Sequence, residues 1–134
     1  MKVVVADASA IVEYLLRTRR ASGIEGVITA TDSDLHVPAL CDIEICSALR
    51  RALLRNRISE ERATEALKDY LDLPLSRHGH VALVEKVLQL RRNFSAYDAT
   101  YVALAEYLKA IFVTEDGSLA RTVRQFFPKW DVRI

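Results

Sequence analysis

The sequence predicts an α/β fold in which a central, mostly parallel sheet of about five strands carries helices on both faces. Two short runs, Val3–Ala6 and Ile111–Thr114, are almost wholly apolar. Such runs are typical of strands that are buried on both faces of a parallel sheet. Around them, apolar residues recur at helical spacing. Strands that alternate with helices favour three layers, with helices above and below the sheet.

The chain has 134 residues, and a domain of that size can bury roughly two-thirds of its unfolded surface without a disulfide or a structural metal. It contains no linker, repeat or low-complexity tract, so we expect residues 1–134 to form a single domain. No apolar run approaches the length of a membrane span. The apolar run near the N-terminus covers only residues 3–6 and ends at Asp7, which argues against a signal peptide. We therefore expect a cytoplasmic protein without membrane contact.

The N-terminal half contains five expected elements. In order, they are a strand over Val3–Ala6, a helix over Ala8–Leu16 that ends near residues 17–20, a helix over Ala21–Ala30, a brief strand over Leu35–Val37 and a helix over Ala39–Arg55. Pro38 closes the second strand, because proline cannot donate to the ladder of a sheet. Ile45, Leu49 and Leu53 form an apolar stripe on the long helix, which is therefore amphipathic.

Two serines mark helix starts in the C-terminal half. Ser59 precedes Glu60 and Glu61, so it is expected to cap a helix whose first turn is acidic. Ser95 and Asp98 have the spacing of a capping box that opens a buried helix ending near Lys109. The other expected elements are an edge strand in which Leu71, Leu73 and Leu75 alternate with polar residues, a helix over Val81–Arg91, a strand over Ile111–Thr114, a helix to Phe127 and a last strand over Trp130–Ile134.

The charge balance excludes a protein that binds nucleic acid by bulk charge alone. Lysine and arginine together number 19 and the acidic residues 18, so the net charge is +1. Arginine, however, outnumbers lysine by 14 to 5. The planar guanidinium suits phosphate, although a GC-rich genome would produce the same bias, and both explanations stay open.

The cysteines and histidines show no metal-ligand spacing. Cys41 and Cys46 diverge by about 140° on a helix, so they cannot share a metal or a disulfide, and we expect small core residues. His36 has no partner at a suitable spacing, and the triplet from His78 to His80 is typical of a loop.

Four carboxylates occupy positions where their side chains can converge. Asp7 follows the first buried strand directly, and Asp116 comes two residues after Thr114 in the second. The carboxyl ends of parallel strands share one edge of the sheet, where ligands bind in such folds. Asp98 lies in the first turn of a buried helix, and Glu44 lies at the rim of the apolar face of the long helix. Clustered carboxylates repel one another unless they are protonated or hold a cation, and Mg²⁺ and Mn²⁺ prefer such oxygen ligands.

Each of these acids also has a purely structural interpretation. Asp7 and Asp116 can cap the helices that follow them, and Asp98 in a first turn suits the helix dipole. Glu44 can pair with an arginine on its own helix. Taken singly, spacing does not decide between a cap and a ligand.

Four segments of the chain resemble segments of the PIN-domain family, in the family's order. They are Val4–Val12, then Val37–Leu40 with Glu44 and Ala48–Leu49, then Ser95–Ala99 with Tyr101–Glu106, and finally Val113–Asp116 with Leu119. The third is the most specific, and together the matches cover nearly the whole chain. The chain is similar in particular to the toxins of VapBC toxin–antitoxin pairs.

The resemblance implies a PIN-like three-layer α/β/α sandwich and a cytosolic endoribonuclease that uses Mg²⁺ or Mn²⁺. It also implies a toxin that is restrained by a cognate VapB-like antitoxin and is usually a homodimer. The residues that match the family's site are the acids Asp7, Glu44, Asp98 and Asp116, with Ser9 and Thr114 as hydrogen-bond donors beside them. Asp42 is offset from Glu44 by about 200° on the helix, so it is not counted as a ligand.

One pattern near Glu44 suits an RNA substrate. Arg51 and Arg55 fall within about 20° of Glu44 around the helix, and a track of cations beside a metal site could hold a phosphate backbone. A solvated face with a Glu–Arg pair is the alternative. The segment Arg91–Asn93 is a weaker candidate of the same kind.

Several other classes lack residues that they need. A phosphoacceptor receiver needs a second acid where Ala8 stands, and an Asp-x-Asp phosphatase needs one at Ser9. The four glycines form no phosphate loop. Two alternatives within the family stay open, a housekeeping RNA-processing nuclease and a PIN-like scaffold that binds RNA or protein without cutting. Intact acids argue against the scaffold, and a small upstream antitoxin-like gene would favour the toxin.

Overall fold

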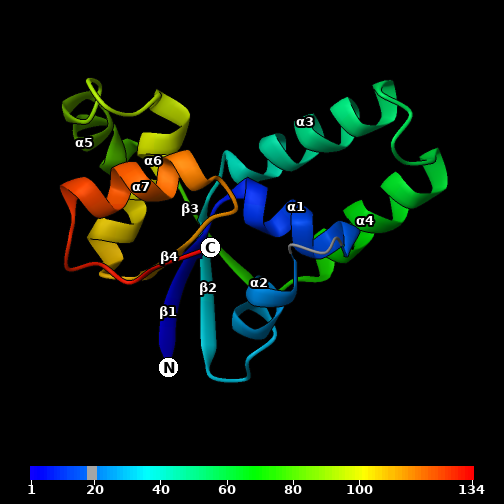
Figure 1. The fold of residues 1–134 in the computed structure, drawn as a ribbon, viewed down its shortest axis with the longest axis horizontal. Coiled ribbons are helices and arrows are strands. Elements are labelled where there is room, and N and C mark those ends of the chain that lie inside the picture. Colours follow the sequence, from blue (N-terminus) through cyan, green and yellow to red (C-terminus); the bar gives the residue numbers. More distant parts are fainter. Residues whose placement is uncertain (18–20) are drawn as a thin grey trace.

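A five-stranded parallel sheet forms the centre of the molecule, as the computed structural model of residues 1–17 and 21–134 shows (Figure 1). The strand order is β3-β2-β1-β4-β5, and all four neighbouring pairs are parallel. The predicted α/β class and strand number are therefore confirmed. The strands are β1 (Lys2–Ala6), β2 (Ser33–Pro38), β3 (Leu75–His78), β4 (Ile111–Val113) and β5 (Val132–Arg133).

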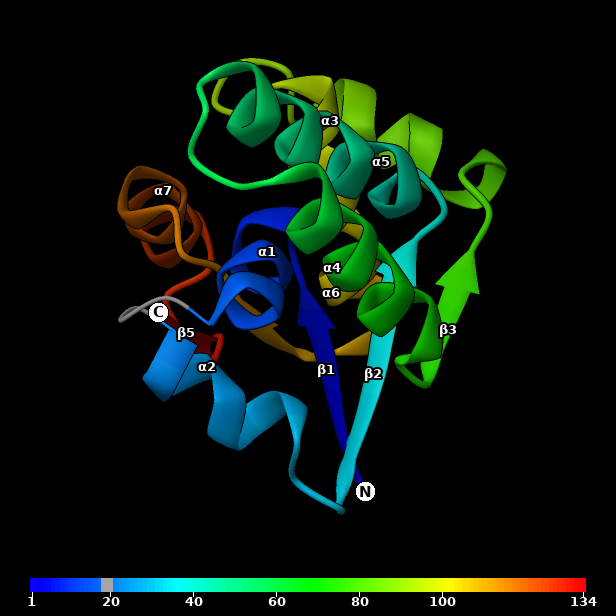
Figure 2. The same ribbon diagram turned by 90° about the vertical axis from the view of Figure 1, so that its right-hand side faces the viewer.

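Helices cover both faces of this sheet, as predicted. They are α1 (Ala8–Leu16), α2 (Ala21–Ile28), α3 (Cys41–Leu54), α4 (Glu60–Asp72), α5 (Val84–Gln89), α6 (Ala96–Leu108) and α7 (Gly117–Phe126), with a short 3-10 turn η1 (Val81–Leu83) before α5. Figure 2 shows α1 and α4 in front of the strands and α6 behind them. Helix α6 packs against β1, β2 and β4, and every residue from Ala99 to Ala105 is buried. None of the helices in the described part of the chain is long and apolar enough to cross a membrane.

The helices α3 and α4 form a hairpin that extends to one side of the sheet (Figure 1). Helix α3 also packs against α1, the helix that directly follows β1. Ile45 and Leu49, two residues of the predicted apolar stripe, are buried on its inner face. The hairpin therefore forms one wall beside the carboxyl edge of the sheet.

The sheet reverses its strand order between β1 and β4. The chain proceeds from β1 to β2 on one side and later enters β4 on the other. Val4, Val5 and Phe112 are completely buried there, as expected for strands covered on both faces. Just past the strand ends, the amide of Asp7 donates to the carbonyl of Val113 at 3.0 Å. Residues that follow these two strands are thus adjacent at the edge where α/β folds bind ligands.

The predicted edge strand over Leu71–Leu75 is wrong in its position. Helix α4 continues to Asp72, since its buried face extends to Tyr70, and the amide of Leu73 donates to the carbonyl of Tyr70 at its end. Strand β3 begins only at Leu75 and includes His78, which was predicted to lie in a loop.

The other expected elements are present with small shifts of their ends. The helix predicted over Val81–Arg91 is divided into η1 and the short α5, which ends at Gln89. Ser59 and Ser95 cap α4 and α6 as predicted. Helix α1 ends at Leu16 with Arg17 as its cap, and residues 18–20, to which its predicted end extended, lie outside the described residues.

Candidate active site

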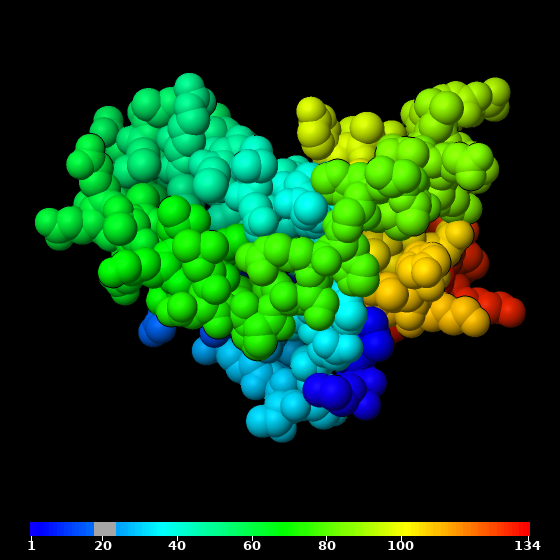
Figure 3. All heavy atoms as spheres, turned by 180° about the vertical axis from the view of Figure 1, so that it is seen from behind, coloured from blue at the N-terminus to red at the C-terminus, as the bar shows by residue number. Residues whose placement is uncertain are grey.

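A cavity of about 300 Å³ opens beside the carboxyl ends of β1 and β4, between α1, α3 and α6. Seen from behind in Figure 3, the surface is hollowed between the residues of α3 and those of α5 and the start of α6. The cavity lining includes all four carboxylates that the sequence indicates, which are Asp7, Glu44, Asp98 and Asp116. Four separate elements supply these side chains.

Asp7 is the most enclosed of the four acids, with only 5% of its surface exposed. It caps α1, because its Oδ1 accepts the amide of Ala10 at 3.0 Å, and it also accepts the hydroxyl of Ser9 at 2.6 Å. Its Oδ2 accepts the hydroxyl of Thr114 at 2.5 Å. Burial raises the pKa of Asp7 to about 6, although these hydrogen bonds act in the opposite direction. The negative charge of Asp98 raises that pKa further.

The hydroxyls of Ser9 and Thr114 connect Asp7 to the segment that follows β4. Ser9 Oγ accepts the amide of Glu115 at 3.1 Å, and Thr114 Oγ1 accepts the amide of Asp116 at 3.0 Å. Each hydroxyl therefore donates to the Asp7 carboxylate and accepts from the backbone. The network fixes the ends of β1 and β4 relative to each other.

Asp116 is exposed at the start of α7. Its Oδ1 accepts the amide of Leu119 at 3.1 Å, so the aspartate caps the helix, which was one of its two predicted interpretations. The hydrogen bond between its own amide and Thr114 holds its backbone next to Asp7.

Glu44 has a buried carboxylate oxygen without a partner. Its Oε1 makes no hydrogen bond with any described residue, and the same holds for the buried hydroxyl of Tyr101. Burial raises the pKa of Glu44 and the charge of Asp98 adds to this effect, while Tyr101 and Arg51 act in the opposite direction. A buried polar atom without a partner is costly unless a ligand completes it.

Asp98 is electrostatically coupled to the other three acids. Its pKa is raised by burial and by the charge of Asp116, and Ser95 counteracts this as a hydrogen-bond partner. Asp98 in turn raises the pKa of Asp7 and of Glu44. The four carboxylates thus form one cluster whose negative charges repel one another.

Comparison with known proteins identifies the family. The profile of the PIN domain matches residues 4–125. The chain belongs to the PIN-domain family. It is 42% identical over 120 residues to VapC ribonuclease Mb0985 of Mycobacterium bovis and to ribonuclease VapC9 of Mycobacterium tuberculosis. Each alignment covers 90% of this chain and 91% of the relative. It is 41% identical over 118 residues to ribonuclease VapC1 of Mycobacterium tuberculosis, covering 87% of both chains.

Solved structures share the fold at lower identity. PAE2754 from Pyrobaculum aerophilum superposes with a TM-score of 0.73 at 22% identity, covering 98% of this chain and 83% of that one. VapC20 of Mycobacterium tuberculosis, a toxin that cleaves the sarcin–ricin loop, superposes with a TM-score of 0.67 at 16% identity and covers 88% and 93% of the two chains. The fold is therefore that of a PIN domain.

The donor set of this PIN domain fits a hard divalent cation. All four acids offer oxygen, which Mg²⁺ and Mn²⁺ prefer, and Glu44 Oε1 is an unpartnered oxygen inside the cavity. Within residues 1–17 and 21–134, no group of three or more His, Cys, Asp or Glu side chains is arranged closely enough to hold a metal ion. The oxygens of Asp7 are directed to hydroxyl and amide donors, and one oxygen of Asp116 caps α7.

The two arginines near Glu44 differ in their placement. Arg51 lines the cavity, and its Nη1 donates to Ser47 Oγ at 3.0 Å. Arg55 instead lines a neighbouring groove between α1 and the end of α3. Among the described residues, neither arginine forms an ion pair with Glu44, so the predicted alternative of a Glu–Arg pair is not observed. Asp42 bonds to Tyr70 and Arg77 outside the cavity, consistent with its exclusion as a ligand.

Three polar cavity residues were not anticipated from the sequence. Glu13, Ser47 and Tyr101 line the same space as the acids. Each follows a predicted site residue on the same helix by three or four positions, so each lies one turn further along the same face. Helical spacing was therefore the signal that could have found them.

Proposed function

We propose that this PIN domain is a divalent-metal-dependent endoribonuclease that hydrolyses RNA phosphodiester bonds in the cytoplasm, as the toxin of a type II toxin–antitoxin system. The observation that carries the proposal is the convergence of four carboxylates from four elements on one cavity. Membership of the family and 42% identity to relatives named VapC ribonucleases support the same chemistry.

Asp7, Glu44, Asp98 and Asp116 would hold Mg²⁺ or Mn²⁺. When bound, such an ion supplies an activated water and neutralises charge that develops on the phosphodiester. It would also relieve the mutual repulsion of the acids, which the raised pKa of Asp98 reflects. Ser9 and Thr114 keep Asp7 oriented by donating to both of its oxygens, so they act as positioning residues.

The cationic side chain at the cavity wall suits the substrate. Arg51 lines the cavity beside the acids and its charge lowers the pKa of Glu44, and its planar guanidinium suits contact with a phosphate. Arg55 lies one turn further along α3 and would extend the contact along the RNA backbone.

The decisive experiment is incubation of the protein with total RNA in Mg²⁺ or in EDTA, beside an Asp7→Asn control. We expect fragments of defined ends only for the wild-type protein with the metal. Equal cutting in EDTA, or full activity of Asp7→Asn, would contradict the proposed chemistry. Binding of RNA without cutting would favour the non-cutting scaffold instead.

A VapB-like antitoxin is the proposed protein partner. The chain superposes on a protein of the VapBC2 complex of Rickettsia felis, which was crystallised with a DNA fragment from its promoter, with a TM-score of 0.66 at 12% identity over 97% of this chain and 96% of that one. Growth arrest by this chain, relieved by the product of an adjacent upstream gene, would support the toxin. Normal growth on expression of an active nuclease would favour a housekeeping RNA-processing enzyme.

A homodimer is also proposed. Val81, Val84 and Leu88 follow one another at helical spacing over η1 and α5, and they are 90%, 54% and 66% exposed. Three large apolar side chains on one stripe favour a protein contact over solvent. Light scattering should give a dimer for the wild-type protein and a monomer for Leu88→Glu. A wild-type monomer at micromolar concentration would exclude this assembly.

A further inference from the structure

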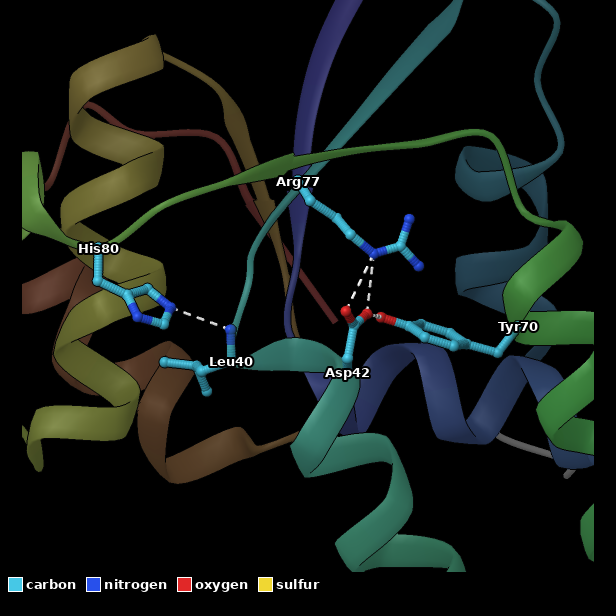
Figure 4. Close-up of polar contacts among 5 residues, drawn as sticks. All are labelled: Leu40, Asp42, Tyr70, Arg77 and His80. Carbon is cyan, nitrogen blue, oxygen red and sulfur yellow. Dashed lines mark hydrogen bonds and ion pairs between the residues drawn. The ribbon is translucent and has the colours of Figure 1, made fainter.

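Helix α3, which carries Glu44, begins without a cap from its own sequence. Its N-cap residue is Leu40, whose side chain cannot accept a hydrogen bond. The start of the helix is instead held by the segment that ends β3. The amide of Ala39 donates to the carbonyl of His78 at 2.8 Å, and the amide of Leu40 donates to Nε2 of His80 at 3.0 Å (Figure 4).

The same segment holds the first turn of α3 from a second side. Arg77 Nε donates to both oxygens of Asp42, at 2.9 Å and 3.2 Å, and the hydroxyl of Tyr70 donates to Asp42 Oδ1 at 2.5 Å. The guanidinium of Arg77 also lies 5.5 Å from the centre of the Tyr70 ring. Tyr70 is only 1% exposed, so this contact is made to a fixed part of the core. Figure 4 shows Arg77 and His80 at two ends of one segment, on either side of the start of α3.

A backbone hydrogen bond connects the start of α3 to Glu44. The amide of Glu44 donates to the carbonyl of Leu40 at 3.1 Å, so the residue whose N–H is held by His80 also accepts, through its carbonyl, the N–H of Glu44. No hydrogen bond holds Glu44 Oε1 itself. The backbone of the first turn of α3, together with the neighbouring Tyr101, therefore sets the place of this carboxylate in the cavity.

We propose that His80 and Arg77 are positioning residues for Glu44, and that they set the metal affinity of the site by fixing the start of α3. The proposal rests on the proposed function, in which Glu44 is a metal ligand. Neither residue lines the cavity, so neither is expected to contact the metal. Loss of a residue that orients a ligand typically lowers metal affinity by about 10–100-fold, and here the effect passes through a helical turn. We expect the lower end, about tenfold.

The test measures Mn²⁺ binding in the absence of RNA, by calorimetry, and the Mn²⁺ concentration that gives half-maximal RNA cleavage. His80→Phe keeps a ring but removes the acceptor, whereas His80→Gln retains an oxygen acceptor. Arg77→Gln removes the guanidinium from a partly exposed position, so it tests the proposal even if His80→Phe folds poorly. Lys86→Gln is the matched control, because Lys86 forms an ion pair with Glu106 at a similar exposure, and this pair joins α5 to α6 without involving α3.

We expect His80→Phe and Arg77→Gln each to weaken Mn²⁺ binding about tenfold, with cleavage largely restored at saturating Mn²⁺. His80→Gln should recover most of the affinity, and Lys86→Gln should match the wild-type protein. In a Glu44→Gln background, His80→Phe should cause no further loss, because its effect passes through Glu44.

Two failures are distinguishable. Unchanged Mn²⁺ affinity in both variants, or a loss that is undiminished in the Glu44→Gln background, would overturn the positioning role while leaving the nuclease intact. Absence of metal-dependent cleavage by the wild-type protein, or of any effect of Glu44→Gln, would instead overturn the proposed function on which it rests.

Discussion

Replacement of Asp7 by asparagine is expected to stabilise the metal-free protein at neutral pH. Asp7 is 5% exposed, and burial raises its pKa from the ordinary 3.8 to about 6. Asparagine has nearly the same shape and keeps an oxygen that can cap α1 through the amide of Ala10. Its amide group can donate to Thr114 Oγ1, which at present donates to the carboxylate. The substitution thus removes the buried charge and keeps most of the contacts.

The sign of the effect follows from the direction of the pKa shift. Because the folded protein holds the proton on Asp7 more tightly than the unfolded chain does, the wild-type protein has its full stability below the unfolded pKa and loses it as pH rises through about 6. The gap between 3.8 and about 6, at about 1.4 kcal/mol per pKa unit, corresponds to about 3 kcal/mol. Asp7→Asn has no such loss, so it should exceed the wild-type free energy of unfolding by up to about 3 kcal/mol at pH 8.

Urea unfolding in EDTA from pH 4 to pH 8 measures this difference. The advantage of Asp7→Asn should disappear toward pH 4, and Mn²⁺ should stabilise the wild-type protein far more than the variant. Asp131→Asn is the control of opposite sign, since its hydrogen bond with Arg133 lowers the pKa of Asp131 and contributes stability only above the unfolded pKa. An Asp7→Asn variant that is less stable than wild type by the same margin at every pH would refute the reasoning.

Three further predictions concern the same cavity. Asp98→Asn should fold, and without metal its melting temperature should match or exceed that of the wild-type protein. Mn²⁺ should raise its melting temperature less than it raises that of the wild-type protein, and RNA cleavage should be lost. A lower melting temperature with retained activity would mean that Asp98 only stabilises the start of α6. Arg51→Ala with Arg55→Ala should weaken RNA binding and lower its salt slope by about one per lost phosphate contact, with Mn²⁺ affinity nearly unchanged; an unchanged slope would make both residues part of a solvated face. Thr114→Val should lower the free energy of unfolding by about 1–3 kcal/mol, because the amide of Asp116 loses its acceptor. It should also raise the pKa of Asp7, so that the acidic limb of the pH profile of RNA cleavage moves to higher pH. An unmoved limb would show that Thr114 does not influence Asp7.

The centre of the fold could be predicted because burial on both faces leaves a simple pattern. The runs that became β1 and β4 contain almost no polar residues, and the acids that end them mark the edge of the sheet. The end of α4 could not be found in this way. Leu71, Leu73 and Leu75 alternate as in a strand, yet Leu71 is an exposed residue of α4 and Leu73 is its cap. Packing of Tyr70 into the core extends the helix past the point where the local pattern changes.

In the candidate site too, local sequence predicted some features and could not predict others. The convergence of the four acids on one cavity could be predicted because strand ends and helix starts can be located from local sequence, whereas their assignment as ligands came from the family resemblance. The contacts that fix the start of α3 could not be predicted, because His80 contacts the amide of Leu40, which lies 40 positions away in the sequence, and Arg77 contacts Asp42, which lies 35 positions away. No local pattern marks His80 as a cap for a helix that lies in another part of the chain. Such contacts follow only from the pairing of β3 with β2, which brings His78 beside Pro38.

The capping and ligand interpretations of these acids turn out to be compatible. Asp7 and Asp116 each use one oxygen to accept a helix amide, as a capping residue does. A carboxylate can accept about four hydrogen bonds or metal contacts, however, so one cap leaves capacity for a cation. At the start of α6 the cap is Ser95, whose hydroxyl oxygen accepts the backbone amide of Asp98, and Ser95 also acts as a hydrogen-bond partner that lowers the pKa of Asp98. The capping bonds hold Asp7 and Asp116 at the edge of the cavity, and Asp98 lines the same cavity. A fold that begins helices directly after parallel strands can therefore keep a repulsive cluster of acids in place before any cation neutralises it.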